Sequence, residues 1–397
     1  MIKKICYNGN RRKGSDLKAI KNGRIVLPDR ILDRHVVVYD EKIQRILPEE
    51  DFSLESVQVL DAQGCYISPG LINLHVHGCG GFDTMDANLP ALRAMQKLLP
   101  ETGVTAFLPT TMTVAWEDLY KSLENIRQAM QNPGEGAKIL GAHMEGPFIS
   151  EAYKGAQAGT HIEKALYSRI APFADVIRVL TVAPECIEDK KAFISACRQA
   201  GILVSLGHSA ASYEETLEAI DAGASRITHL FNAMPGLHHR KPGLLGAALA
   251  QPVSCEMITD NVHVHPAVQQ ILYQLKPRDK ITLITDSMRA CMLGDGISEL
   301  GGQKVIVKDD VARLADGTIA GSVLRMNEGV WNFWQNTGCS LPEAIAAASL
   351  NPARELGLEQ ACGSVGVGKR ADLTLLDERL QVKRTIIGGK NVYMCSP

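Results

Sequence analysis

The sequence lacks the signals of export, of membrane insertion and of nucleic-acid binding. Its longest apolar runs fall well short of a membrane-spanning helix, and the basic segment 1–13 is not followed by an apolar core. Lysine and arginine (42) nearly balance aspartate and glutamate (44), so a net charge of -2 creates no attraction to nucleic acid or anionic lipid. The 10 cysteines form no CxxC pair, and a chain of this length needs no disulfides. We therefore expect a cytoplasmic protein with reduced thiols.

The motifs of several large enzyme classes are also missing. There is no G-x-S-x-G elbow for a nucleophilic serine and no GxxxxGK[ST] loop for a nucleotide phosphate. The glycines within 78–81 do not have the spacing of a dinucleotide-binding fingerprint. These absences weigh against serine-esterase, nucleotide-hydrolysing and dinucleotide-dependent chemistry.

The pattern that is present is that of an α/β protein. With 397 residues, 45% of them hydrophobic, the chain has room for one large domain and a smaller companion. Apolar runs alternate with segments of helical periodicity, which predicts a closed (β/α)8 barrel of the TIM type, with a doubly wound open sheet as the alternative. The predicted strands are 66–74, 105–108, 139–144, 176–182, 202–206, 227–230, 255–259 and 281–285, and the predicted helices between them include 89–99, 116–131, 192–200 and 213–222.

Both ends of the chain are rich in short β-type runs. The runs 23–28 and 35–46, with Asp40 at a hairpin bend, resemble the tail runs 363–377 and 383–393, so we expect the two ends to form one small β-sandwich. This predicts a sandwich domain from 1–67 and 363–397 and a barrel domain from 68–362. Within the barrel domain we expect a β-hairpin insertion around 298–320, with arms at 300–308 and 312–320, and a helix over 341–356.

Polar side chains fall at the ends of the predicted barrel strands. His75 and His77 follow the first strand, Glu145 the third and His208 the fifth. His229 lies in the sixth strand, and Asp286 ends the eighth. The carboxyl ends of all strands of such a barrel meet on one face, so four histidines and two carboxylates should converge there.

This set of groups is suited to binding a divalent metal. A single histidine after an apolar strand is more often structural than a ligand, but six suitable groups at matching strand ends reverse that preference. Imidazole and carboxylate together favour Zn, Fe, Mn, Co or Ni over Mg or Ca. Such a site supports hydrolysis, with Asp286 as the proton shuttle. The competing interpretation is that Asp286 and Ser287 cap the N-terminus of a helix.

A series of motifs carries a resemblance to a known family. The segments are 69–78 (PGLINLHVHG), 143–148 (HMEGPF), 154–157 (KGAQ), 207–208 (GH), 228–235 (THLFNAMP), 285–286 (TD), 320–322 (AGS) and 368–372 (GKRAD). In that order and over nearly the whole chain, the sequence resembles the N-acetylglucosamine-6-phosphate deacetylases of the amidohydrolase superfamily.

The resemblance implies a metal held by Glu145, His208 and His229, with Asp286 as catalytic acid and base. It also implies a phosphorylated amino sugar as substrate and a homodimer in which Arg240 reaches the neighbouring subunit's site. An arginine, a histidine and backbone amides are good ligands for a phosphate dianion. The implied substrate contacts are Ala156, Gln157, Asn232, Ala233, Arg240, Asp260, His263, Gly321, Ser322, Val323 and Leu324.

Three features depart from the one-metal form of this family. His75 and His77 are both present, which resembles the subgroup with two metals bridged by a carboxylate. The resemblance therefore implies one or two ions per chain, with Zn or Fe favoured. Gln157 stands where other members carry a histidine that polarises the acetamide carbonyl, and an amide can donate a hydrogen bond but no charge. Arg325 adds a charge near the expected sugar loop.

Several alternatives stay open at the level of sequence. Deacetylation of N-acetylgalactosamine 6-phosphate differs only in the orientation of one hydroxyl group, and the sequence does not distinguish it. Dihydroorotase-like enzymes open cyclic amides, but they often use a carboxylated lysine where this chain has Glu145. A catalytically silent scaffold is the third possibility, although the intact candidate ligands argue against it. His238 and His239 border the phosphate loop without an assigned role, and His143 is a candidate partner of a metal ligand.

Overall fold

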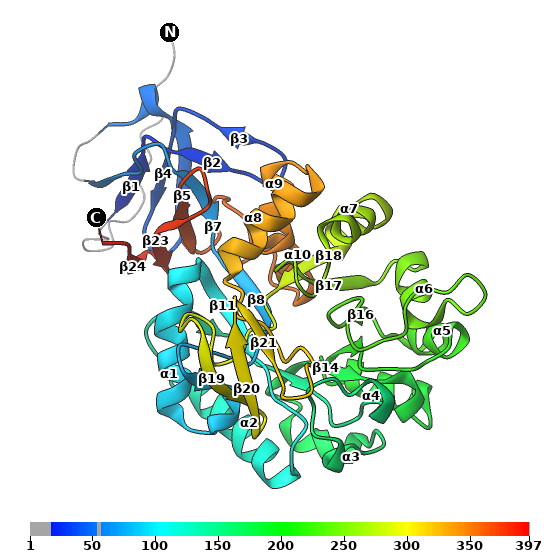
Figure 1. The fold of residues 1–397 in the computed structure, drawn as a ribbon. Coiled ribbons are helices and arrows are strands. Elements are labelled where there is room, and N and C mark those ends of the chain that lie inside the picture. Colours follow the sequence, from blue (N-terminus) through cyan, green and yellow to red (C-terminus); the bar gives the residue numbers. More distant parts are fainter. Residues whose placement is uncertain (1–16, 54–56, 397) are drawn as a thin grey trace.

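The computed structural model describes residues 17–53 and 57–396 and consists of a barrel flanked by a small β unit (Figure 1). No helix among these residues combines the length and the apolar character that crossing a membrane requires. Figure 1 shows the blue and red chain ends together in the β unit at the top, and the barrel with its helices below.

The barrel contains eight parallel strands, as the sequence predicts. Hydrogen-bonded parallel ladders join β8 to β11 and link β13 through to β18 in chain order. Parallel bridges from Thr110 to His143 and from Val76 to Ser287 join the two arcs, so the sheet closes and the open-sheet alternative is excluded. The strands are β8 (Leu71–Val76), β11 (Val104–Pro109), β13 (Ala142–Glu145), β14 (Ile177–Val182), β15 (Leu203–Leu206), β16 (Arg226–Ile227), β17 (Ser254–Ile258) and β18 (Ile281–Ile284).

Helices cover the outside of the barrel. The helices α2 and α5 begin and end where the sequence predicts, and α5 has a Ser212–Glu215 capping box at its start and Gly223 in the left-handed conformation at its end. The helix α6 escaped the sequence analysis because it is almost wholly buried and apolar, which leaves no helical periodicity to read. The helices are α1 (Leu89–Leu98), α2 (Trp116–Gln131), α3 (Tyr167–Ile170), α4 (Lys190–Gln199), α5 (Tyr213–Ala222), α6 (Gly243–Ala250), α7 (Pro266–Leu275), α8 (Met326–Thr337), α9 (Leu341–Ala347) and α10 (Leu350–Glu355).

Several predicted elements differ in the structure. The run 139–144 is interrupted, because Gly141 has a φ of 144° and separates β12 (Lys138–Ile139) from β13. The run 66–74 is two strands, because β7 (Tyr66–Pro69) joins the flanking β unit and only β8 enters the barrel. The predicted helix 341–356 is broken into α9 and α10, since Pro352 has no N–H for an unbroken helix and lies instead in the first turn of α10. His229 follows β16 rather than lying within it.

The two chain ends pair as predicted. One sheet has the order β24-β23-β22-β7-β2-β3, in which β7 lies between β22 from the C-terminal end and β2 from the N-terminal end. A second sheet has the order β5-β4-β1-β6, with the predicted bend between β4 and β5. Ile20, Val37, Ile67, Leu373 and Ile386 share the hydrophobic cluster of this unit. The division into 1–67 with 363–397 and 68–362 stays a proposal, and residues 1–16, 54–56 and 397 lie outside the part of the chain that the structure describes.

The other strands of the β unit are short. They are β1 (Lys18–Lys21), β2 (Arg24–Val26), β3 (Ile31–Leu32), β4 (His35–Tyr39), β5 (Ile43–Pro48), β6 (Gln58–Asp61), β22 (Leu373–Leu376), β23 (Val382–Ile387) and β24 (Lys390–Met394).

The insertion after β18 is a three-stranded antiparallel sheet rather than a hairpin. It contains β19 (Gly296–Leu300), β20 (Gln303–Lys308) and β21 (Val311–Arg313). The rest of the predicted second arm is not strand, because 314–320 turns back toward the barrel, where Ala320 is buried. Val305 and Val307 pack in one cluster with Met112 and Met288, which anchors the insertion at the carboxyl ends of the barrel strands.

Candidate metal centre

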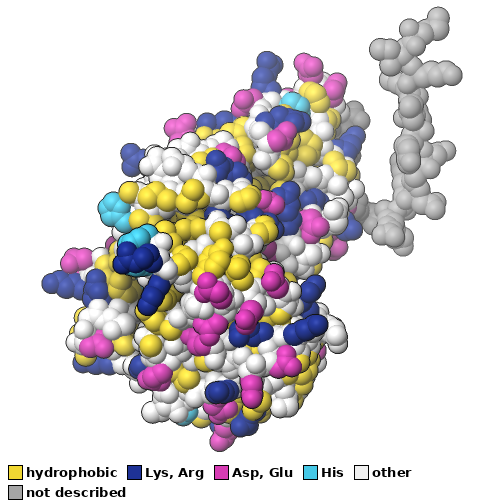
Figure 2. Space-filling view, turned by 90° about the vertical axis from the view of Figure 1, so that its right-hand side faces the viewer, with side chains coloured by type: hydrophobic (Ala, Val, Ile, Leu, Met, Phe, Trp, Pro, Cys, Tyr) yellow, Lys and Arg dark blue, Asp and Glu magenta, His cyan; other side chains and the backbone are white. Residues whose placement is uncertain are grey.

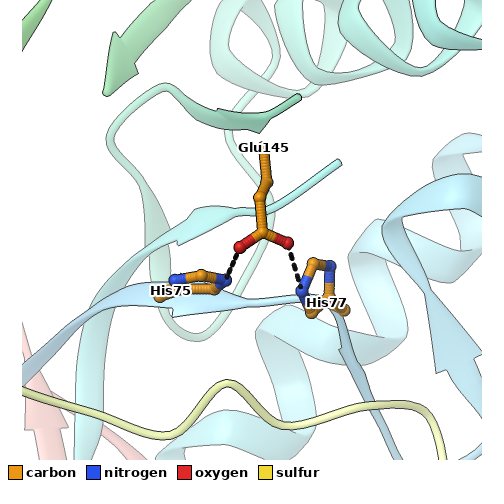
Figure 3. Close-up of side chains that lie close together, drawn as sticks. All are labelled: His75, His77 and Glu145. Carbon is orange, nitrogen blue, oxygen red and sulfur yellow. Dashed lines mark ion pairs between the residues drawn. The ribbon is translucent and has the colours of Figure 1, made fainter. Parts of the chain in front are cut away.

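The six polar groups predicted to converge do so at the carboxyl ends of the strands. His75 and His77 are alternate residues at the end of β8, so both imidazoles point to the same side (Figure 3). The Glu145 carboxylate, from the end of β13, lies between them. His75 Nε2 is 3.4 Å from Glu145 Oε1, and His77 Nε2 is 3.4 Å from Glu145 Oε2.

A second group of ligands uses the same carboxylate. His208 Nε2 and His229 Nε2 both lie 3.2 Å from Glu145 Oε1. Asp286 Oδ1 completes the first group, at 3.3 Å from His75 Nε2 and 3.1 Å from His77 Nε2. Among the described residues, three triads have ligand atoms close enough to hold an ion: His75, His77 and Glu145; His208, His229 and Glu145; and His75, His143 and Glu256. The first two share the Glu145 carboxylate.

The backbone is strained at three of these residues. His208, His229 and Asp286 have positive φ angles of 49°, 27° and 50°, a region that side chains other than glycine rarely adopt. Each turn ends a barrel strand and directs the side chain inward. Such strain persists mainly where the surroundings enforce it, and here it occurs at three residues whose side chains converge. No helix follows Asp286 among the described residues before α8, so the alternative of a helix cap is wrong.

The electrostatics of the cluster favour a bound cation. Burial lowers the pKa of His75, but the carboxylates of Asp286, Glu145 and Glu256 outweigh it, and the pKa is raised. The pKa of His77 rises to about 9 because its contacts with Asp286 and Glu145 likewise outweigh burial. The pKa of Glu145 is lowered, since His75 and His208 outweigh the effect of burial. Buried carboxylates that hold protons on neighbouring imidazoles would hold a metal ion in the same place.

The donor atoms also fit a metal. His75 Nε2 is buried, faces the carboxylates of Glu145 and Asp286, and has no hydrogen-bond partner among the described residues, an arrangement that is costly unless a ligand is bound. Nδ1 of His77 faces Thr110 O at 3.2 Å, and Nδ1 of His208 faces Tyr153 O at 3.0 Å. A carbonyl oxygen only accepts, so Nδ1 carries the hydrogen and Nε2 has the free lone pair. The residues present thus suit a divalent metal.

A cavity of ≈ 260 Å³ opens beside the cluster. His77, Glu145, His208, His229 and Asp286 form its polar floor, whereas His75 is fully buried behind it. Many of the predicted substrate contacts lie in its wall: Ala156, Gln157, Asn232, Ala233, His263 and Gly321.

Five other predicted contacts do not line the cavity. Asp260 lies behind His263, with its Oδ2 2.6 Å from His263 Nδ1. Ser322 donates its hydroxyl hydrogen to Thr285 O at 2.6 Å, beside the catalytic candidate Asp286. Val323 and Leu324 pack in hydrophobic clusters. Arg240 is exposed, and its guanidinium lies 2.6 Å from His239 Nε2.

Gln157 is held firmly at the edge of the metal ligands. Its Nε2 donates to Glu145 Oε2 at 2.6 Å, and its Oε1 accepts from the backbone N–H of Thr113 at 2.7 Å. One of the two amide hydrogens is therefore used on Glu145. The second remains for a group in the cavity, whose wall includes Gln157.

Sequence reasoning missed two kinds of functional residue. Leu300, Thr318 and Ile319 of the insertion line the cavity, and no sequence motif predicted this. Glu256 contacts His75 from the middle of β17, and the only signal for it was a charged residue inside a run predicted to be a buried strand. His143, a candidate partner of a metal ligand, packs edge-on against the His75 ring with 4.4 Å between the ring centroids, and its two nitrogens contact Leu74 O and Thr181 Oγ1.

The chain is similar to known proteins over most of its length. The family model described as Amidohydrolase family matches residues 66–392. N-acetylglucosamine-6-phosphate deacetylase of Bacillus subtilis (strain 168) is 38% identical over 385 residues, 94% of this chain and 97% of that protein. N-acetylgalactosamine-6-phosphate deacetylase of Escherichia coli O157:H7 is 38% identical over 342 residues, 84% of this chain and 89% of that protein. The crystal structure of N-acetylglucosamine-6-phosphate deacetylase from Pasteurella multocida superimposes with a TM-score of 0.90 at 32% identity, over 94% of this chain and 99% of that one.

Proposed function

The chain belongs to the amidohydrolase family, and from this premise we propose that it deacetylates N-acetyl-D-glucosamine 6-phosphate. The products are D-glucosamine 6-phosphate and acetate. The observation that carries the proposal is the pair of triads that share Glu145, with Asp286 beside them on the floor of a cavity. The proposed substrate is supported by the names of the relatives, and the proposed hydrolysis is supported by the residues of the candidate metal centre.

The residues divide the chemistry between them. His75, His77, Glu145, His208, His229 and Asp286 would hold two divalent ions, with Zn or Fe favoured by the mixed nitrogen and oxygen donors. Divalent ions held by these residues would lower the pKa of a bound water toward neutrality and would polarise a carbonyl group. Asp286 accepts the proton of the attacking water and donates it to the amine nitrogen as the C–N bond breaks. Gln157 offers its second amide hydrogen to the oxygen on which negative charge develops.

The galacto substrate is the second candidate. It is favoured by the 38% identical relative named N-acetylgalactosamine-6-phosphate deacetylase. Cyclic amides have less support, because the shared carboxylate here is Glu145 rather than a modified lysine. The described cysteines are all unpaired, which supports a cytoplasmic location.

The test of the reaction is acetate release by purified protein with its metal content measured. We expect about two metal ions per chain and acetate release that needs the 6-phosphate, with the gluco and galacto substrates compared by kcat/KM. Removal of metal by a chelator should abolish release, and addition of metal should restore it. Release from unphosphorylated N-acetylglucosamine at an equal rate would contradict the substrate, and metal-independent release would contradict the mechanism.

The phosphate requires a cation that the cavity does not provide. Its described wall contains His263 but no lysine or arginine, although a phosphate dianion is normally bound by such groups. Arg240 is exposed, and Leu237, three residues earlier in the sequence, is an apolar side chain that is 59% exposed. The face that carries α5, α6 and α7 shows apolar side chains gathered beside histidines and basic residues (Figure 2). We propose that two chains pair there and that Arg240 binds the phosphate in the partner's cavity.

The Arg240→Ala variant should therefore raise KM for the phosphorylated substrate by about tenfold or more, with little change in kcat. The reason is that the substitution removes one charge-assisted contact to the phosphate. Lys241→Ala, which removes the neighbouring exposed charge, is the matched control. Equimolar mixing of Arg240→Ala with Asp286→Asn should regain activity, because one mixed site contains neither substitution. A monomer in light scattering, or a mixture no more active than its parts, would contradict the proposal.

A further inference from the structure

Glu256 connects two candidate metal ligands from inside the barrel. It lies in β17 with only 1% of its surface exposed. Its Oε2 is 3.1 Å from His75 Nδ1 and accepts the backbone N–H of His229 at 3.2 Å. Its own carbonyl accepts the N–H of Leu230 at 2.9 Å. One buried carboxylate thus contacts the side chain of a ligand from β8 and the backbone of a ligand after β16.

A buried arginine keeps this carboxylate ionised. Arg226 Nη2 lies 2.6 Å from Glu256 Oε1, and the arginine is 1% exposed. Its other terminal nitrogen pairs with Glu355 of α10, which also accepts the hydroxyl of Thr282. Because Arg226 has two acidic partners, loss of one of them leaves its charge paired with the other.

The ionised carboxylate determines the tautomer of His75. A carboxylate without a proton can only accept, so His75 Nδ1 carries the hydrogen and Nε2 keeps its lone pair. Nε2 faces Glu145 Oε1 and Asp286 Oδ1. The corresponding Nδ1 atoms of His77 and His208 face neutral carbonyl groups. His75 therefore differs from His77 and His208 in having a negatively charged partner, which makes its Nε2 a stronger electron-pair donor to a metal ion.

We propose that Glu256 is a positioning residue for the metal ion held on the His75 and His77 side. It fixes the ring and tautomer of His75 and strengthens Nε2 as a ligand, while Arg226 secures its charge. The ion held by Glu145, His208 and His229 does not depend on this contact to the same degree. The inference rests on the proposed metal centre and makes the two metal positions unequal.

The experiment is a metal titration of metal-depleted full-length protein against a competing chelator, with metal analysis after dialysis. Glu256→Gln keeps a neutral acceptor for Nδ1–H and should bind one of the two ions about tenfold more weakly. Glu256→Ala has no acceptor and should bind that ion about 100-fold more weakly, the usual range for loss of a group that orients a ligand. The second ion should be retained by both variants.

Glu355→Gln is the matched control, because it disturbs the same buried arginine without touching His75. It should lower the unfolding temperature and leave both metal affinities within about twofold. Glu256→Gln with lowered unfolding temperature but unchanged metal affinity would overturn the proposal, since Glu256 would then be purely structural. If Glu256→Ala does not fold, the Gln variant alone decides. The titration measures metal binding and not acetate release, so its result can be interpreted even if the proposed substrate is wrong. If the wild-type protein bound no metal, both the metal centre and the role of Glu256 would be contradicted.

Discussion

The Asp286→Asn variant is expected to release acetate about 10³ times more slowly than the wild-type protein, or slower still. Asparagine has nearly the same shape but neither accepts the proton of water nor returns it to the leaving amine. Asp286 Oδ1 lies within 3.3 Å of both His75 and His77, so the substitution also removes one candidate ligand. Burial raises the pKa of Asp286, but the charges of His75 and His77 lower it by more, which keeps the carboxylate ready to accept a proton.

The measurement is kcat for acetate release, with the metal content determined on the same samples. The loss should fall on kcat rather than KM, because the group acts on the reacting atoms. Asp221→Asn, at an exposed position of α5, is the control and should match the wild type. If Asp286→Asn kept metal and lost less than about tenfold in kcat, another group would have to be the acid and base.

The Glu145→Gln variant should lose both metal ions and, with them, activity. Among the described residues, Glu145 is the ligand that the His75–His77 triad and the His208–His229 triad share, so its substitution removes a ligand from both at once. We expect each metal affinity to fall by more than about 100-fold, beyond the range seen when only a supporting group is removed. Addition of metal should raise the unfolding temperature of the wild-type protein and not that of the variant, because ligands stabilise only the state that binds them.

The comparison variant is His77→Gln, which touches one triad and should leave one ion bound. A Glu145→Gln protein that keeps two ions per chain would show that the shared carboxylate does not bridge them. A protein that loses one ion would assign Glu145 to a single position.

Most of the fold could be predicted because local signals agree with the tertiary structure. The helix 116–131 was found to the residue since its apolar side chains Leu119, Leu123 and Ile126 recur at helical spacing and are buried. The strand after which His229 lies was predicted too long, because the left-handed turn at His229 ends the ladder and no sequence pattern marks that turn. The barrel expectation held for a topological reason, since eight βα units of this size close most readily into a barrel.

The candidate site was predictable only where its residues end strands. His75, Glu145 and His208 follow apolar runs, and barrel geometry brings such positions together. Glu256 and Arg226 could not be assigned, because their pairing joins residues 30 positions apart inside the barrel and no local pattern encodes it. The part of the cavity wall that the insertion forms was not predicted for a similar reason. How 314–320 turns back depends on packing against Met112 and Met288, not on local propensity.

The sheet that joins the two chain ends can be completed only after almost the whole chain has been synthesised. The strand β7 ends at Pro69, and its neighbour β22 begins only at Leu373. About 300 residues must therefore leave the ribosome before β7 gains that partner, which takes roughly 15–60 s at typical rates of chain elongation. During this interval the edge of β7 and the apolar side chains beneath it are exposed while the barrel is completed. The nascent chain should therefore depend on chaperones more than the finished protein does.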